Sequence, residues 1–190
     1  MTALFLGAHA DDIELGCGAT FQQYERAIYV AFSSCGKFDL IEECKRSTFI
    51  LRAEETLIFN FEVRNFDKSR QEILDHMITL REKYNPDFVY THSHDSHQDH
   101  SVIHNESIRA FKHTNLLVYE LPWNDRHTNL NTFTPITPEQ LRKKVIALSK
   151  YRTQAHRLYM NANFITSLAT VRGVQAGCEY AEAFESIRRF

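Results

Sequence analysis

Short apolar runs alternate with helix-like segments over most of this 190-residue chain, and this alternation restricts the fold more than any other feature. The apolar runs have the length and residue content of buried strands, and they occupy residues 4–9, 28–33, 56–61, 87–92 and 115–121. Helical patterns occupy residues 18–26, 40–52, 69–84, 100–111 and 138–151. Such an alternation predicts an α/β fold: a Rossmann-like, mainly parallel sheet flanked by helices.

The chain length is typical of one domain, so we expect a single domain over residues 1–190. The alternation stops at residues 122–138, where turn-forming residues predict a loop with room for an edge strand. The tail, residues 163–190, is predicted to be mostly helical around Arg172 and Gly173.

The charge balance and the cysteines narrow the function class. A net charge of −2 without a basic stripe argues against a nucleic-acid or membrane-surface binder. We find no signal peptide and no apolar run long enough for a membrane helix. The cysteines form no CxxC pair and no disulfide framework. We therefore expect a cytoplasmic protein with reduced thiols at Cys17, Cys35, Cys44 and Cys178.

Three ligand-type side chains, His9, Asp11 and Asp12, follow the first predicted strand. Ligands of open α/β sheets bind beyond the carboxyl ends of strands, so these residues fall where a site is expected. Adjacent carboxylates point in different directions, which lets one bind a metal ion while the other faces substrate. The alternative is that both aspartates only cap the next helix. Gly16 and Gly18 permit a close approach to a ligand but do not complete a dinucleotide-binding fingerprint.

A second group of ligand-type residues follows the fourth predicted strand in the segment THSHDSHQDHSVIH. Imidazole and carboxylate ligands without thiolates suit Zn²⁺ or a similar ion such as Fe²⁺. One alternative is a solvated histidine-rich loop. Another is a helical metal pair of His100 and His104, but Ser101 stands where that motif needs glutamate. The group comprises His92, His94, Asp95, His97, Asp99, His100 and His104.

Together the two groups resemble the motifs of the PIG-L/LmbE-like zinc deacetylase family. AHADD resembles the first family motif, with Ala10 in place of the usual proline, and HQDH resembles the second. NPDFVYTH, YRTQ and RGVQAGCEYAEAF extend the likeness to a bacterial branch of the family and to most of the chain.

The resemblance implies a role for each residue of the two motifs. His9, Asp12 and His100 would hold the metal ion, Zn²⁺ or another divalent metal such as Fe²⁺. Asp11 would be the general base that takes a proton from the attacking water. A protonated His97, oriented by Asp99, would act as an acid or stabilise the oxyanion. Either Asp11 or His97 would protonate the leaving amine.

Substrate contacts are assigned to Arg64, Arg70, Asp95 and Arg172. The two arginines after the third strand would bind a sugar hydroxyl or a phosphate, unless they are ordinary surface residues. Asp95 would orient a ligand or touch substrate, or would be a solvated loop acid. Arg172 belongs to the tail motif with Tyr180 and Glu182, and these residues would wall the pocket, unless Tyr180 only packs. Trp123 would stack on a sugar ring or anchor its loop.

The predicted function is a zinc-dependent amide hydrolase that removes acetyl from an N-acetylated amino sugar or its conjugate, with Asp11 as base. One alternative is an inactive module that binds metal and sugar. Another is a hydrolase of a non-acetyl or non-sugar amide. The expected partner is a small molecule, with no nucleic acid, and the resemblance is compatible with a homo-oligomer. The sequence does not select among free, nucleotide-linked, lipid-linked and thiol-linked substrates.

Overall fold

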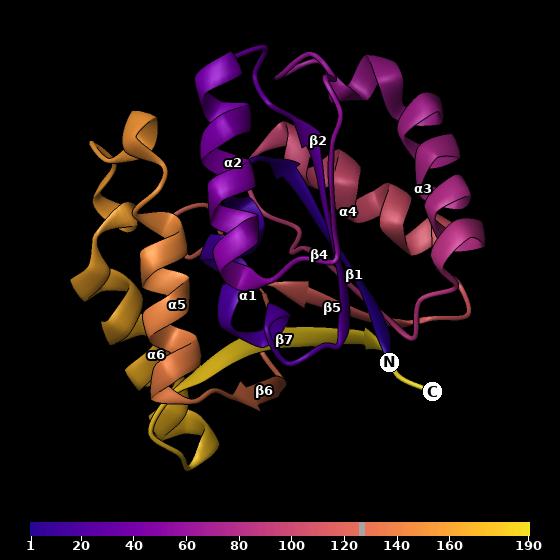
Figure 1. Ribbon diagram of the computed structural model, residues 1–190. Coiled ribbons are helices and arrows are strands. Elements are labelled where there is room, and N and C mark those ends of the chain that lie inside the picture. The colour runs from indigo at the N-terminus through magenta and orange to yellow at the C-terminus, as the bar shows by residue number, and fades with distance from the viewer. Residues whose placement is uncertain (126–127) are drawn as a thin grey trace.

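A seven-stranded sheet forms the centre of the protein in a computed structural model, which describes residues 1–125 and 128–190 (Figure 1). The strand order is β3-β2-β1-β4-β5-β7-β6. Strands β1 to β5 are parallel to one another, and β7 is antiparallel to both of its neighbours. The strands are β1 (Thr2–His9), β2 (Arg26–Ser33), β3 (Glu55–Ile58), β4 (Phe88–His92), β5 (Asn115–Tyr119), β6 (Thr132–Pro135) and β7 (Ala181–Arg188). The predicted α/β fold with a mainly parallel sheet is confirmed.

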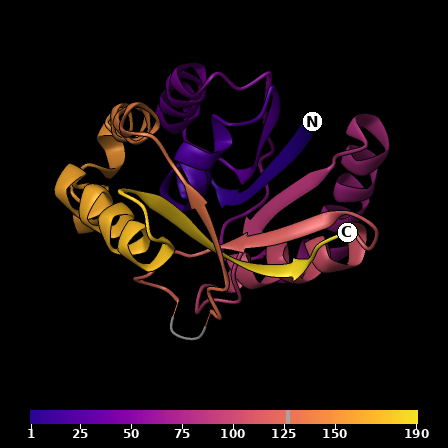
Figure 2. The same ribbon diagram turned by 90° about the horizontal axis from the view of Figure 1, so that it is seen from below.

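Helices cover both faces of the sheet, with α1, α2, α5 and α6 on one face and α3 and α4 on the other (Figures 1 and 2). Each face buries its own apolar cluster, one around Phe5 and Tyr29 and the other around Leu4 and Val30. The alternation of side chains along a strand produces this division. The helices are α1 (Asp12–Phe21), α2 (Phe38–Leu51), α3 (Arg70–Tyr84), α4 (Gln98–Ala110), α5 (Pro138–Leu148) and α6 (Ala162–Ala176), with 3₁₀ turns η1 (Phe66–Ser69), η2 (Arg152–Gln154) and η3 (Leu158–Met160).

The prediction of a mostly helical tail is wrong for its second half. Helix α6 ends at Ala176, and Gly177 caps it in the left-handed conformation with a φ of 72°. Residues Ala181–Arg188 then form β7, inserted between β5 and β6. Alanine and glutamate favour helix locally, but pairing with two strands and burial of Phe184 override that preference. The expected edge strand is β6, while Arg126 and His127 of the predicted loop lie outside the described residues.

Helix α1 begins six residues before its predicted start at Gly18. Gly16 lies inside this helix at a position with no room for a side chain, because a Cβ there would come within 2.2 Å of the Tyr119 ring. Gly18 faces Lys144, so these glycines allow close contact with protein side chains. A non-helical Cys17, with φ of −148°, divides α1 into two segments. No helix in the described ranges combines the length and the apolar character needed to cross a membrane.

The strand order places the two ligand-rich segments next to each other. From β1 the chain proceeds to β2 and β3 on one side, whereas β4 and β5 lie on the other. The sheet therefore reverses its winding between β1 and β4, which are parallel neighbours. Ligands of such folds bind in the crevice at this reversal, beyond the carboxyl ends of the strands. His9 and His92, the last residues of β1 and β4, both reach this crevice.

Candidate metal centre

The turn from β1 into α1 sends its two aspartates in different directions. Asp11 has a φ of 94° and its side chain makes no capping hydrogen bond. The Oδ2 atom of Asp12 accepts the backbone N–H of His9 at 2.7 Å. The capping alternative therefore does not account for either carboxylate, because neither accepts an N–H of the first helical turn.

His9 lies between two carboxylates. Its Nε2 is 3.0 Å from Oδ2 of Asp99, and its Nδ1 is 3.4 Å from Oδ2 of Asp12. Burial alone would lower the pKa of His9, but the hydrogen bonds and charges of Asp12 and Asp99 raise it to about 10. A position that binds a proton this tightly has the charge balance to hold a cation.

His100 has the same arrangement on the opposite side of Asp12. Its Nδ1 is 2.6 Å from Oδ2 of Asp95, and its Nε2 is 3.5 Å from Oδ2 of Asp12. Asp95 is buried and orients this imidazole, so it does not behave as a solvated loop acid. A carboxylate behind each imidazole is the usual support for a metal-binding histidine.

Asp12 lies at the spacing that a small metal ion requires from both His9 and His100. Ligands about 2.0–2.1 Å from a tetrahedral Zn²⁺ lie roughly 3.3 Å from one another. Asp12 Oδ2 is 3.4 Å from Nδ1 of His9 and 3.5 Å from Nε2 of His100. The residues present therefore fit a divalent ion, and their nitrogen and oxygen donors suit zinc or iron(II).

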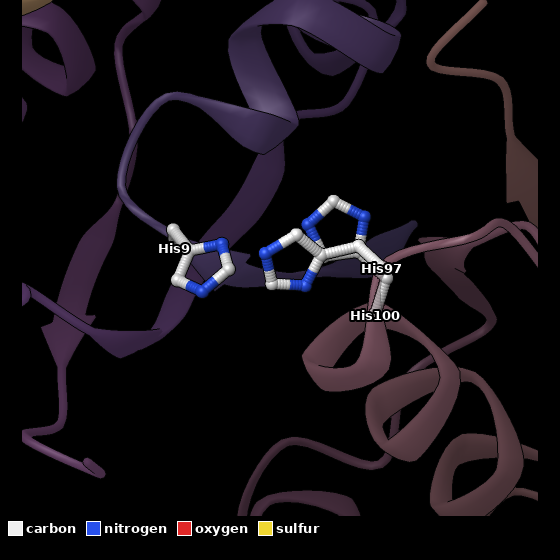
Figure 3. A group of neighbouring side chains, drawn as sticks. All are labelled: His9, His97 and His100. Atoms are coloured by element: carbon white, nitrogen blue, oxygen red, sulfur yellow. The ribbon is translucent and has the colours of Figure 1, made fainter. Parts of the chain in front are cut away.

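His97 lies beside this group at the start of α4. Figure 3 shows its ring close to those of His9 and His100, with ring centroids 5.0 Å and 4.4 Å away. The backbone N–H of Asp99 donates to Nδ1 of His97 at 3.2 Å, so a neutral imidazole carries its proton on Nε2. Burial and the neighbouring histidines lower the pKa of His97. The lowered pKa favours a neutral His97, and the carboxylate of Asp99, which was expected to orient His97, hydrogen-bonds His9.

Asp11 is buried at the edge of the group. Burial, followed by the charges of Asp12 and Glu14, raises the pKa of its carboxyl well above the ordinary value. The raised pKa makes Asp11 a stronger base than a solvated aspartate. Asp12 behaves in the opposite way: burial would raise its pKa, but the charge of His100 and the hydrogen bond of His9 contribute to lowering it well below the usual range.

His92 contributes to the centre in a way that sequence reasoning missed. Its Nε2 accepts the N–H of Ala8 at 2.9 Å and lies 3.2 Å from Oδ2 of Asp12. Burial and His100 lower its pKa to about 4, so it is neutral. Two groups of the described residues have donor atoms close enough to share an ion: His9, His97 and His100, and Asp12, His92 and His100. In the second group, the N–H of Ala8 already uses Nε2 of His92. His92 stacks on His100 at 3.9 Å and forms the floor of the centre.

The metal pair of His100 and His104 does not form. Nδ1 of His104 lies 2.8 Å from the carbonyl oxygen of His92. Neither possible ligand set found in the described residues contains His104. The alternative of a solvated histidine-rich loop also fails for His92, His100 and His104, because all three are buried.

A pocket of about 360 Å³ opens over the centre. Trp123 forms one wall by stacking on Tyr159 at 3.9 Å, so its indole is part of an aromatic pair. Arg157, which donates to Gln154 at 2.7 Å, lies on the same side. Sequence reasoning missed Arg157 and Tyr159, since no motif links them to residues 9–12. The lining comprises His9, Ala10, Asp11, Asp12, Leu15, Cys35, Leu40, Val63, Arg64, His97, His100, Trp123, Asn124, Gln154, Arg157 and Tyr159.

Among the arginines assigned to substrate, the structure brings only Arg64 to this pocket within the described residues. Arg70 lies outside it and donates to the buried Glu106 at 2.6 Å. Arg172 also lies outside and makes a two-point ion pair with Glu120 at 2.7 and 2.6 Å. The guanidinium groups of both residues are paired with carboxylates of the protein, so neither belongs to the proposed substrate site.

The other tail residues also serve the fold. Glu182 accepts the backbone N–H groups of Ala19 and Thr20 at 3.1 and 2.7 Å, where the irregular Cys17 interrupts α1. Its carboxylate also receives Lys144 at 2.6 Å. Tyr180 packs against the apolar cluster on this face. Neither Glu182 nor Tyr180 is among the described residues that line the pocket, and the packing alternative holds for Tyr180.

Comparison with known proteins supports the interpretation of the two motifs. Residues 4–111 match the family model described as PIG-L: GlcNAc-PI de-N-acetylase. The chain is also 28% identical over 166 residues to the uncharacterized deacetylase YaiS of Escherichia coli K12, covering 79% of this chain and 90% of that protein.

Solved structures share the fold at lower identity. N,N'-diacetylchitobiose deacetylase from Pyrococcus horikoshii superposes with a TM-score of 0.73 and 17% identity, over 97% of this chain and 82% of that one. The 4-carboxy-2-hydroxymuconate hydratase GalB from Pseudomonas putida gives a TM-score of 0.79 and 18% identity, over 100% and 98%. At these identities the likeness shows a common fold, which serves both a deacetylase and a hydratase.

Proposed function

Because the chain belongs to the PIG-L family of de-N-acetylases, we propose that it is a metal-dependent hydrolase that removes acetyl from an N-acetylated amino sugar or its conjugate. One observation carries the proposal: Oδ2 of Asp12 lies at ligand spacing from both His9 and His100, and the carboxylate of Asp11 lies beside them with a raised pKa. A centre built only to bind sugar has no use for such a base.

His9, Asp12 and His100 would hold the metal ion through Nδ1, Oδ2 and Nε2. When bound, a divalent ion supplies electrophilic polarisation and lowers the pKa of water. Asp99 and Asp95 keep the far nitrogens of the two imidazoles occupied, which directs the near nitrogens to the centre. These ligand roles would be the same for zinc and for iron(II).

Asp11 and His97 divide the proton chemistry. Asp11 takes the proton of the attacking water, and its raised pKa lets it hold that proton until the amine leaves. His97 donates its Nε2–H to the oxygen of the acetyl carbonyl, which gains negative charge during the attack. Because this His97 is neutral, Asp11 is the better candidate to protonate the leaving amine.

The pocket walls suit a sugar with polar substituents. The stacked Trp123 and Tyr159 present an aromatic pair, and sugar rings offer apolar faces to such surfaces. Arg64, Asn124 and Arg157 add polar groups around it. The volume of about 360 Å³ is at the small end for ligand pockets, which favours one sugar ring with its acetyl group inside.

The direct test measures release of primary amine and of acetate from a panel of N-acetylated sugars and conjugates. The panel includes free, nucleotide-linked, lipid-linked and thiol-linked forms, each with and without a chelator. The proposal expects chelator-sensitive release of equal amounts of both products from at least one member. Amine release without acetate would indicate a non-acetyl amide instead. Binding to sugars without any release, by a protein that holds its metal, would favour the inactive module.

A further inference from the structure

A buried carboxylate surrounded by hydroxyl groups lies beneath the turn that carries Asp11. Glu14 of α1 accepts hydrogen bonds from Tyr29 at 2.9 Å, Ser47 at 2.6 Å and Tyr151 at 2.7 Å. Glu14, Tyr29 and Ser47 are fully buried, and Tyr151 is 1% exposed. None of the four is among the described residues that line the pocket, so the cluster does not touch substrate.

The hydroxyl of Tyr29 also contacts the turn that carries Asp11. The backbone N–H of Asp11 lies 3.4 Å from this oxygen and donates to it. Since the hydroxyl proton of Tyr29 points to Glu14, the oxygen lone pairs remain available to Asp11. The hydroxyls of Ser47 and Tyr151 reach the other oxygen of Glu14.

The backbone of Asp11 needs such a partner. Its φ of 94° lies in a region that residues with a Cβ rarely adopt, and strained positions persist only when their surroundings enforce them. On its carbonyl side, Asp11 is fixed by the N–H of Leu15 at 3.0 Å. On its amide side, the hydroxyl of Tyr29 is the acceptor that the described residues provide.

We infer that Tyr29 is a positioning residue: its hydroxyl, oriented by Glu14, holds the Asp11 peptide in the conformation that aims the carboxylate into the pocket. Glu14 therefore acts on the base through one hydrogen-bond relay from the core. The catalytic consequence rests on the proposed function, whereas the backbone consequence does not. Tyr29→Phe removes only the hydroxyl, and Tyr151→Phe is a matched control that removes a different phenol from the same carboxylate.

The first measurement follows hydrogen exchange of the Asp11 amide by NMR, and it needs no substrate. Tyr29→Phe should speed this exchange relative to the wild type, while Tyr151→Phe should leave it close to the wild-type rate. Amides in the centre of β1 serve as the reference for global opening and should exchange alike in all three proteins. Unchanged protection of Asp11 in Tyr29→Phe overturns the inference.

The second measurement compares rates in two backgrounds. Tyr29→Phe should lower kcat by about 10- to 100-fold with little change in KM, because a small misplacement of a catalytic group has that effect. Metal content should be unchanged, and Tyr151→Phe should retain most of its kcat. In an Asp11→Asn background, Tyr29→Phe should cause no further loss, since it acts only through Asp11.

An equal further loss in that background would show a merely structural role and would overturn the inference. An active wild type whose two phenylalanine variants have the same kcat would also overturn it, and the proposed function would stand. If the wild type releases no amine from any substrate, the proposed function fails. The exchange measurement then still decides whether Tyr29 holds Asp11.

Discussion

The two ends of helix α1 differ in how their buried charges are paired. At the C-terminal end, Glu182 receives two backbone N–H groups and Lys144, so its charge is compensated within the protein. At the N-terminal end, Asp12 faces the near nitrogens of two imidazoles, and Asp11 makes no capping bond. Buried carboxylates therefore have protein partners at one end, whereas at the other end they lie in the proposed metal and substrate site.

Removal of a ligand should have the largest effect. His100→Ala deletes the Nε2 that faces Asp12, so we expect the protein to lose most of its metal and its amide hydrolysis with it. The loss should exceed the roughly 10- to 100-fold change that follows removal of an orienting carboxylate. Metal per chain by mass spectrometry and amine release on the same sample check this. Wild-type metal content in the variant would remove His100 from the centre.

Neutralising the base should come next. Asp11→Asn keeps the size of the side chain but cannot accept the proton, so kcat should fall by about 10²–10⁴-fold. Metal content and binding of a substrate analogue should survive, because Asp11 is not among the ligands. Single-turnover kinetics with metal analysis test this, and Asp12→Asn is the matched control, which should lose metal. Equal metal loss in both variants would show that the two aspartates do not have separate roles.

Substitution of a carboxylate that orients a ligand should have a smaller effect. In Asp95→Asn an amide N–H would point at Nδ1 of His100, which favours a proton on Nε2, the atom that faces the centre. Metal affinity should fall by roughly 10- to 100-fold. Competition with a chromophoric chelator measures this, and excess metal should restore the rate. Failure of excess metal to restore it would indicate that Asp95 acts on substrate.

At the other end of α1, Glu182→Gln should leave the chemistry unchanged. The variant keeps one acceptor oxygen but leaves the buried charge of Lys144 without its partner. We expect a stability loss of about 3 kcal/mol, typical of breaking a buried pair, and an unchanged kcat per folded molecule. Urea unfolding and kcat at 25 °C check this. A loss of kcat with intact stability would place Glu182 in the catalytic machinery and end the contrast between the two ends.

Strand ends were the most predictable part of the site. Short apolar runs identify β1 and β4, and polar ligands directly after them must lie at the same edge of a parallel sheet. That reasoning brought His9, Asp12, His97 and His100 together before any distance was known. It worked because the strand period and the direction of parallel strands are local properties of the sequence.

Pairing partners from distant parts of the chain were not predictable. Asp99 was expected to orient His97, yet its carboxylate binds His9, because the turn of α4 directs it across to β1. Arg70 and Arg172 were assigned to substrate, yet each has a buried carboxylate partner 36 or 52 residues away in sequence. A sequence shows the charge of such residues but not whether that charge is already compensated.

The strand in the tail and the left-handed conformation of Asp11 were missed for related reasons. Residues 181–188 favour helix by composition, and only pairing with two strands makes them β7. The φ of Asp11 is equally hidden, since no glycine marks that position and the core hydroxyl of Tyr29 lies 18 residues away. In both cases tertiary contacts decide a conformation that the local sequence does not prefer.

The conformation of Asp11 also has an evolutionary consequence. A residue with a Cβ in the left-handed region and a buried carboxylate both reduce stability, so Asp11, the proposed base, lowers the stability of the protein. Selection for heat resistance that ignored activity would therefore tend to replace Asp11, with glycine as the least strained substitute. A stabilised variant of this protein is useful as a catalyst only if that selection excludes residue 11.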